Sequence, residues 1–426
     1  MTNFFKIDKN LKTLAENIEL KIKPQFKQID EIALFNESKV LKAFLDNKVS
    51  SNHFIETTGY GYGDTGKIVI DNVFKQIFKT ESSLTRCSFV SGTHAISIAL
   101  FSLLNPNDVL LSVTGSPYDT INKIIGSKNQ NTKIKTLTKY GVKFKQIELL
   151  KNGDFDLNTI KSALKNKVKL IYIQRSRGYS LRPAISIKKI QKLVNLVKHI
   201  SAKTIILVDN CYGEFVEKKE PTEVGANLIC GSLIKNPGGA IAQSGGYIAG
   251  DEKLIEQCAN TLTAPGLGKE IGCNFNQNKN ILMGIFLAPK IVSNALKLSI
   301  FARNLFSKLG LKVFPKINTQ PTDIVSAIEL KSKNALLCFC KGIQNNSPID
   351  SFLTPTPWPM PGYDCDIIMA AGTFINGASI EISADAPIKP PYNVFLQGGI
   401  TYNTGKICIL NTAQQLINNK FLKLPN

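Results

Sequence analysis

The sequence predicts a doubly wound α/β domain followed by a smaller α+β domain. Between residues 86 and 250, six apolar runs alternate with helical patterns, and the runs are too short and too evenly apolar to be amphipathic helices. Such runs are typical of strands in a mainly parallel sheet that helices cover on both faces. The runs are CSFV (87–90), VLLSV (109–113), KLIYI (169–173), TIILV (204–208), LICGS (228–232) and GGYIAG (245–250).

Helical patterns lie before, between and after these runs. Residues 1 to about 55 predict two polar helical stretches, HAISIALFSLL (94–104) follows the first run, and IKKIQKLVNLVKHI (187–200) precedes the fourth. After about residue 285 the chain changes to a helix and then to strands broken by Pro and Gly. We therefore divide the chain into an N-terminal helical arm (1–60), a large domain (61–285) and a C-terminal small domain (286–426).

The composition is that of an ordinary soluble globular protein. Of the 426 residues, 43% are hydrophobic and 20% are charged, which excludes a disordered or collagen-like chain. The nine cysteines are scattered without a CxxC pair, which argues against a disulfide framework or a zinc ribbon and fits a reducing cytosol. No signal-peptide core and no run of roughly 18 apolar residues is present, so we expect a cytoplasmic protein without a membrane segment.

The formal net charge of +20 does not by itself indicate a nucleic-acid partner. The excess is Lys spread over the whole chain, without the interleaved aromatics or the arginine stripe that base recognition needs. Arg is rare, yet Arg175, Arg177 and Arg182 all lie in QRSRGYSLRP (174–183). This cluster indicates a site where a carboxylate or a phosphate is bound by the planar guanidinium group of an arginine, through two of its N–H donors.

Chemically useful residues follow five of the predicted strands, which is where an open parallel sheet binds its ligands. They lie in SGTHA (91–95), TGSPYDT (114–120), QRSRGY (174–179), DNCYGE (209–214) and GSLIKNPGG (231–239). These segments offer hydroxyls with glycine, an aromatic ring, arginines, a carboxylate and a lysine. A pyridoxal phosphate site calls for all five.

This interpretation gives individual residues a role. Lys235 is the candidate for the Schiff base, Asp209 for the acid that keeps the pyridine nitrogen protonated, and Tyr118 for the ring that stacks on the cofactor. The phosphate would lie at a helix N-terminus and after the fifth of these strands, against Ser91, Gly92, Thr93 and Ser232.

Taken singly, each of these residues also fits an ordinary structural role. A lysine is usually a solvated surface residue, and Tyr118 can be a packing residue. Asp209 and the SGTHA segment can be helix caps. His94 fits a contact with the cofactor ring and a structural histidine equally well.

The glycine-rich segment GYGYGDTGK (59–67) matches both GxGxxG and the start of a Walker A loop. A P-loop needs Ser or Thr after the lysine, and this chain has Ile68. Both motifs should also follow a buried strand, whereas the preceding NHFIETT is polar. The segment is therefore a flexible glycine loop, or an arm whose Tyr60 and Tyr62 reach a phosphate.

Several stretches resemble the methionine γ-lyase-like family often labelled aluminium-resistance proteins, a branch of the fold-type I pyridoxal phosphate enzymes. They are SGTHAISIALFSLL, LLSVTGSPYDT, YIQRSRGYSLRP, VDNCYGEFVEKKEPTEVGANLICGSLIKNPGG, LTAPGLGKEIG and AAGTFINGASIEISAD. The resemblance runs from about residue 55 to the C-terminus. It implies an aspartate-aminotransferase-like large domain, a smaller C-terminal domain, and a homodimer or homotetramer with shared active sites.

The resemblance also supports the roles given above to Lys235, Asp209, Tyr118 and the phosphate-binding residues. It implies that Tyr60 and Tyr62 form a phosphate-binding arm supplied by a neighbouring subunit. The well-studied γ- and β-lyases bind the substrate carboxylate with an Arg of the C-terminal domain. This chain has only Arg303 after residue 182, in a predicted helix, so we assign that role to Arg175 or Arg177.

The reaction that the resemblance implies is α,β- or α,γ-elimination from a sulfur amino acid such as cystathionine, methionine or cysteine. Lys235 would remove the Cα proton, which requires its pKa to fall well below the ordinary value of about 10.4. The alternatives are an aminotransferase, another pyridoxal phosphate reaction on an amino acid, or a non-catalytic pyridoxal-binding stress protein.

Overall fold

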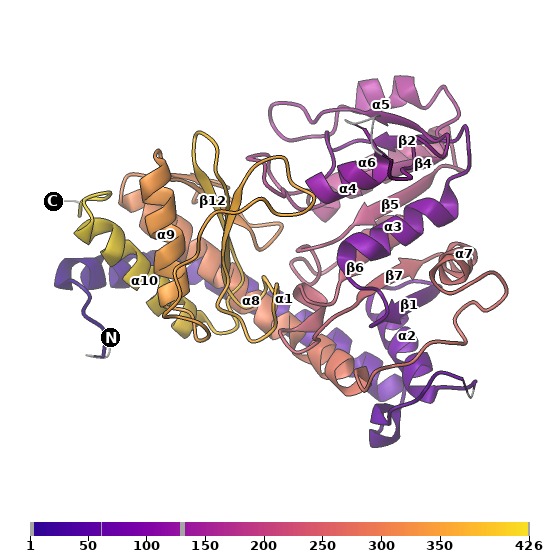
Figure 1. Ribbon diagram of the computed structural model, residues 1–426, viewed down its shortest axis with the longest axis horizontal. Coiled ribbons are helices and arrows are strands. Elements are labelled where there is room, and N and C mark those ends of the chain that lie inside the picture. Colours follow the sequence, from indigo (N-terminus) through magenta and orange to yellow (C-terminus); the bar gives the residue numbers. More distant parts are fainter. Residues whose placement is uncertain (1–3, 61, 128–132, 425–426) are drawn as a thin grey trace.

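The computed structural model describes residues 4–60, 62–127 and 133–424, and these contain two sheets (Figure 1). A seven-stranded, mainly parallel sheet belongs to the N-terminal part, and a five-stranded antiparallel sheet belongs to the C-terminal part. The predicted α/β fold with a smaller α+β domain is therefore confirmed. The boundaries at residues 60 and 285 stay predictions, and α8 (Asn278–Lys308) runs unbroken through the second of them.

The large sheet has the strand order β1-β7-β6-β5-β4-β2-β3. Strands β3, β2, β4, β5 and β6 run parallel, and β7 is antiparallel to both of its neighbours. The strands are β1 (Ser82–Arg86), β2 (Val109–Ser112), β3 (Lys143–Gln146), β4 (Leu170–Gln174), β5 (Ile205–Asp209), β6 (Leu228–Ser232) and β7 (Gly246–Gly250).

The structure corrects the prediction for the first strand. Residues 87–90 form a turn, and the strand β1 lies just before them. Polar residues can be buried in β1 because α2 supplies their partner: the Asp71 carboxylate accepts from the Thr85 amide at 2.8 Å and from Arg86 Nη1 at 2.8 Å. Strand β3 was not predicted, since KFKQ is a mostly exposed edge strand without an apolar run.

Helices cover both faces of the large sheet. Because side chains alternate along a strand, Leu170 and Tyr172 of β4 pack in the cluster with α3, α4 and α7. Ile171 and Ile173 pack in the opposite cluster with α2, α6 and α8. The helical elements of this part are η1 (Ser51–Phe54), α2 (Thr65–Ile77), α3 (Gly92–Leu103), α4 (Asp119–Ile125), α5 (Leu157–Ala163), α6 (Ile187–Ile200), η2 (Pro221–Val224), η3 (Asn236–Gly238) and α7 (Glu252–Leu262).

The N-terminal region forms one long helix, α1 (Lys9–Asp46), instead of the two predicted stretches. Pro24 lies inside it and removes a backbone hydrogen bond. A buried apolar stripe continues on both sides of the proline, through Ile22 and Ile29, and α1 packs along α8 (Figure 1). This tertiary packing holds the helix together across the proline.

Helix α8 is long and apolar enough to cross a membrane, the only such helix among the described residues. However, 67% of its apolar window is buried inside the protein. Its apolar surface therefore already belongs to the core, where α8 also contacts α1 and α10 (Tyr402–Asn418).

The small domain is a five-stranded sheet with the order β10-β11-β12-β9-β8, all of it antiparallel. Helices α9 and α10 pack against each other, and α9 also packs against the sheet. The elements are β8 (Lys312–Phe314), β9 (Ser326–Glu329), α9 (Lys333–Asn345), β10 (Ile367–Ala370), β11 (Ser383–Pro387) and β12 (Asn393–Gln397).

We predict that Asn36→Ala lowers the free energy of unfolding by about 1–3 kcal/mol. The Asn36 side chain is fully buried on α1 and donates to the carbonyls of Phe215 and Glu217, each at 3.2 Å, so its loss leaves those acceptors unsatisfied. Chemical denaturation measures the change. Asn17→Ala, on the exposed face of the same helix, is the control and should leave the stability unaltered; equal stability of both variants would contradict the prediction.

Candidate active site

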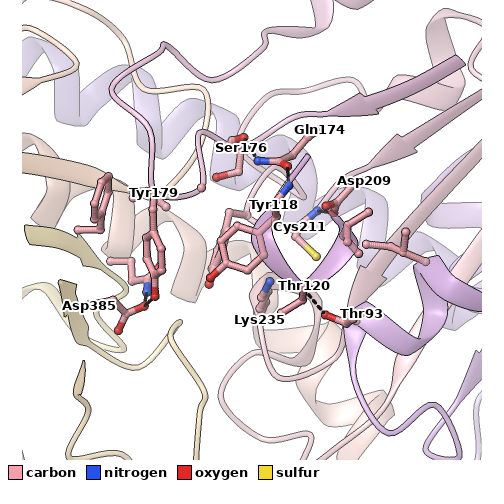
Figure 2. A pocket seen from close by; sticks show the side chains of 18 residues that line it. Thr93, Tyr118, Thr120, Gln174, Ser176, Tyr179, Asp209, Cys211, Lys235 and Asp385 are labelled. Atoms are coloured by element: carbon pink, nitrogen blue, oxygen red, sulfur yellow. Dashed lines mark hydrogen bonds between the residues drawn. The ribbon is translucent and has the colours of Figure 1, made fainter. Parts of the chain in front are cut away.

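One pocket lies where the carboxyl ends of β4, β5 and β6 meet the small domain (Figure 2). Residues at the N-termini of α3 and α4 line it on the large-domain side, and residues of β11 and β12 line it on the other. The sequence-predicted residues that line it together are Lys235, Asp209, Tyr118, Gly92 and Thr93.

Lys235 follows β6 directly and is the residue that precedes η3. Its ammonium lies 4.3 Å from the centroid of the Tyr212 ring. Burial acts to lower the pKa of Lys235, but its acidic neighbours, led by Cys211 and Tyr212, outweigh burial and raise the pKa overall. The lowered pKa that the elimination reaction requires of Lys235 is therefore not a property of the protein chain by itself.

Asp209 ends β5 and is 7% exposed. One carboxylate oxygen accepts from the Tyr172 hydroxyl at 3.2 Å, and the other accepts from the Cys211 amide at 3.1 Å. The carboxylate therefore lies fixed at the edge of the pocket instead of capping a helix.

Tyr118 precedes α4, and its amide donates to Gln174 Oε1 at 2.7 Å. Its hydroxyl lies 2.6 Å from that of Tyr363, which comes from the small domain. Burial, with Tyr363 as the next cause, raises the pKa of Tyr118 well above its usual range. The ring is therefore held by both domains at the pocket wall, as a neutral phenol.

The N-terminus of α3 packs tightly against the end of β6. A Cβ added at Gly92 would lie 2.8 Å from the Cβ of Ser232, so only glycine permits this approach. The Thr93 hydroxyl lies 3.1 Å from that of Thr120 (Figure 2). Free amides of a helix N-terminus with adjacent hydroxyls form a suitable site for a phosphate.

Ser91 and His94 stabilise the N-terminus of α3. The Ser91 hydroxyl accepts from the His94 amide at 3.1 Å and caps α3. His94 Nδ1 accepts from the Val90 amide at 3.2 Å, and its ring packs edge-on against Phe89. Of the two roles considered for His94, the structural one is favoured, while the phosphate role of Ser91 stays a prediction.

The described residues of the glycine-rich segment, 59–60 and 62–67, do not line this pocket. Tyr60 and Tyr62 are 85% and 68% exposed, and neither lines the pocket of its own chain. Lys67 lies in the first turn of α2 and donates to the carbonyls of Glu270 and Gly272, at 3.2 Å and 2.9 Å. Lys67 is thus a structural lysine, and a phosphate-binding role of the two tyrosines in a neighbouring subunit stays a prediction.

Arg175, one of the two candidates for binding the substrate carboxylate, does not line this pocket. Arg175 is fully buried behind the pocket, where it donates to Glu217 at 2.8 Å and to Asn210 at 2.8 Å. A third acceptor, Glu220, lies at 3.4 Å. These bonds occupy its guanidinium and fix the segment that carries Asn210.

Arg177 does not line the pocket either. It is 2% exposed, and its Nε lies 3.7 Å from Asp323 Oδ2. Arg303 is fully buried and donates to the carbonyls of Pro315, Lys316 and Thr319. No arginine is therefore among the described residues that line this pocket.

Sequence reasoning missed several residues of the pocket. Gln174 and Tyr212 lie in segments that were singled out, but only the structure shows that their side chains turn inward. Tyr179, Asp385, Phe395 and Gln397 form the opposite wall. The last three come from antiparallel strands of the small domain. Asp385 ends a stretch that resembles the family, but no spacing or strand-end position marks any of the three as a pocket residue.

Known proteins resemble this chain in sequence and in structure. A family model described as methionine gamma-lyase matches residues 11–417. The chain belongs to this family. The resemblance drawn from the sequence is thereby confirmed.

Similar proteins and structures cover almost the whole chain. An uncharacterized protein, YnbB of Bacillus subtilis (strain 168), is 43% identical over 412 residues, covering 97% of this chain and 98% of its own. A solved structure described as a carbon–sulfur lyase involved in aluminium resistance, from Clostridium novyi NT, is 45% identical with a TM-score of 0.92 over 96% of each chain. Cystathionine gamma synthase of Xanthomonas oryzae pv. oryzae, 13% identical with a TM-score of 0.62 over 90% of this chain and 98% of its own, shares the fold.

The residues present fit pyridoxal phosphate. An amine on Lys235 and a fixed carboxylate on Asp209 line one pocket, and the start of α3 at Gly92 and Thr93 lies there beside the hydroxyls of Thr93 and Thr120. These are the three groups that the cofactor's aldehyde, ring nitrogen and phosphate require.

We predict that Arg175→Met destabilises the protein by about 3–5 kcal/mol, because it leaves the buried Glu220 carboxylate without its cation. Denaturant unfolding measures the loss, with the exposed Lys188→Met as the matched control. A variant of normal stability whose KM for an amino acid is raised would instead restore the substrate-binding role.

We also predict a pH dependence of stability that comes from Glu214. Burial raises the pKa of this carboxyl to about 8, although Tyr247 donates to it at 2.7 Å. The folded protein holds this proton more tightly than the unfolded chain, so the stability contributed by Glu214 is lost as the pH rises from about 4.5 to about 8.

Glu214→Gln should therefore show a smaller decrease in unfolding free energy between pH 5 and pH 8 than the unsubstituted protein. Denaturation curves at several pH values test this, with the exposed Glu256→Gln as control. An unaltered pH profile in Glu214→Gln would show that another group carries the effect.

Proposed function

We propose that the protein is a pyridoxal phosphate-dependent carbon–sulfur lyase that acts on a sulfur-containing amino acid by β- or γ-elimination. The observation that carries this proposal is the convergence of Lys235 and Asp209 on one pocket. Membership in the methionine gamma-lyase family and the likeness to a carbon–sulfur lyase support the same chemistry.

Pyridoxal phosphate, when bound, supplies an electron-withdrawing ring that delocalises the electron pair left at the substrate Cα. Lys235 Nζ would hold the cofactor through its aldehyde carbon. When its amine is not bound to the cofactor, Lys235 Nζ would take the proton from the substrate Cα. Asp209 would keep a proton on the pyridine nitrogen, because its carboxylate is already fixed by Tyr172 and the Cys211 amide.

The other residues bind and orient. The α3 amides at Gly92 and Thr93, with Ser232 beside them, would hold the phosphate, and Tyr118 would cover one face of the ring. Residues of the small domain form the opposite wall of the pocket. Overall, the substrate and one water yield a thiol, a 2-oxo acid and ammonia.

We predict that Lys235→Ala lowers the formation of 2-oxo acid from a sulfur amino acid by at least about 10³-fold, since it removes the base. The same variant should lose the visible absorbance of the covalently held cofactor. Both are measured on purified protein, by a coupled assay for the 2-oxo acid and by an absorbance scan.

Lys253→Ala replaces an exposed lysine on α7 and should keep both signals. Turnover that survives in Lys235→Ala would refute the assignment. Release of a new amino acid in place of ammonia would identify an aminotransferase, and the absorbance without any substrate-dependent change would identify a non-catalytic binding protein.

A further inference from the structure

Asp385 is a buried carboxylate on the small-domain side of the pocket, and the proposed chemistry does not use it. It lies on β11, is 5% exposed and lines the pocket with Tyr179. Figure 2 shows Asp385 and Tyr179 on one side of Lys235, with Asp209 and Thr93 on the other. Asp385 therefore lines the part of the pocket that lies away from Asp209 and Thr93.

The two oxygens of Asp385 differ in their surroundings. Oδ2 accepts from Gln397 Nε2 at 2.7 Å and from the Tyr179 hydroxyl at 3.3 Å. Oδ1 is buried and has no hydrogen-bond partner. Two donors thus fix the orientation of the carboxylate but leave half of its accepting capacity unsatisfied, which is costly for a buried charged group.

No cation of the described chain forms an ion pair with Asp385. Within the described lining of the pocket, Lys235 is the single cationic side chain, and its amine is assigned to the cofactor and to Cα. A buried carboxylate in a binding pocket without its own cation indicates that a ligand supplies one.

The wall next to Asp385 is apolar. Phe395 is 3% exposed, and its ring centroid lies 5.1 Å from that of Tyr179. Val325, also buried, completes this wall. A chain of methylene groups or a thioether fits such a surface, and the carboxylate lies beside it.

We propose that Asp385 binds a cationic amine at the distal end of the substrate side chain, so that the protein selects sulfur amino acids with a second ammonium group over methionine and cysteine. This inference rests on the proposed function, since it names the substrate class of the same pocket. The ammonium would donate to this carboxylate, beside the donors Gln397 and Tyr179.

The ionisation of Asp385 is compatible with this role. Burial raises the pKa of its carboxyl to about 6, while Tyr179, Gln397 and Lys235 act in the opposite direction. At pH 8 the carboxylate is therefore mostly charged, and assays are best made there.

The experiment compares pairs of compounds that differ only in the terminal group, on the protein loaded with pyridoxal phosphate at pH 8. The reactive pair is S-(2-aminoethyl)-L-cysteine and S-propyl-L-cysteine, in which a methyl group replaces the ammonium. Elimination from the first consumes one water and gives 2-aminoethanethiol, pyruvate and ammonia. The unreactive pair is L-lysine and L-2-aminoheptanoate, in which a methylene replaces the sulfur, and calorimetry measures their binding.

We expect the unsubstituted protein to favour the ammonium compound of each pair by roughly 10- to 100-fold, in kcat/KM and in affinity. Asp385→Asn keeps the shape and should bring both ratios close to one, with little change for the neutral compounds. The matched control is Asp364→Asn, which removes an exposed carboxylate of the same domain and should preserve both ratios.

Equal binding of both members of a pair by the unsubstituted protein, or a preference for the neutral one, would overturn the inference without use of any variant. An equal loss for both compounds in Asp385→Asn would also overturn it, because it would show that Asp385 only positions Tyr179. If L-lysine is preferred but neither cysteine derivative reacts, the proposed elimination fails while the assignment of Asp385 stands. If both derivatives react equally well, the elimination stands and the assignment fails.

Discussion

The register between three parallel strands is the constraint on which the site depends. Gln174 at the end of β4 pairs with Asp209 at the end of β5, and Asp209 pairs with Cys230 of β6. Neighbouring strands lie only about 4.8 Å apart, so residues that follow these ends are brought to one edge although they are far apart in sequence. A shift of one residue in any strand would turn its last side chain to the opposite face of the sheet.

The segment after β5 is held in a conformation that the chain would not adopt alone. Tyr212 and Phe215 have φ angles of 67° and 62°, in the region that costs residues with a side chain about 1–2 kcal/mol. Arg175 stabilises this turn from behind, because it bonds to Asn210 and to the carbonyl of Gly213, both at 2.8 Å. These hydrogen bonds therefore help to place the Tyr212 ring beside Lys235, and they give Arg175, one member of the arginine cluster, a structural role.

The sequence was sufficient to locate Lys235, Asp209 and Tyr118 in one pocket, because each of them follows or ends a strand of the parallel sheet. The apolar runs of β2, β4, β5, β6 and β7 identify the sheet, and the polar residues behind them identify Lys235, Asp209 and Tyr118 as neighbours. It was insufficient where burial is achieved by polar partners, as in β1 with Asp71, or where an edge strand such as β3 buries little. Local sequence rules also do not predict the unbroken helix α1, because its packing along α8 stabilises the helix despite Pro24.

The small domain explains why half of the pocket could not be predicted. Its strands are antiparallel, so successive side chains face either the pocket or the helices, and no common edge collects the functional residues. Asp385 and Gln397 become neighbours only through the pairing of β11 with β12, which joins Ser383 to Gln397. Tyr363 reaches Tyr118 from a loop. The large domain thus carries the groups suited to a pyridoxal reaction, while the antiparallel sheet carries the groups that we propose bind the rest of a substrate. Because these two sets lie on different domains, the side-chain specificity of such an enzyme can change through β11 and β12 without disturbing the strand register that unites Lys235 and Asp209.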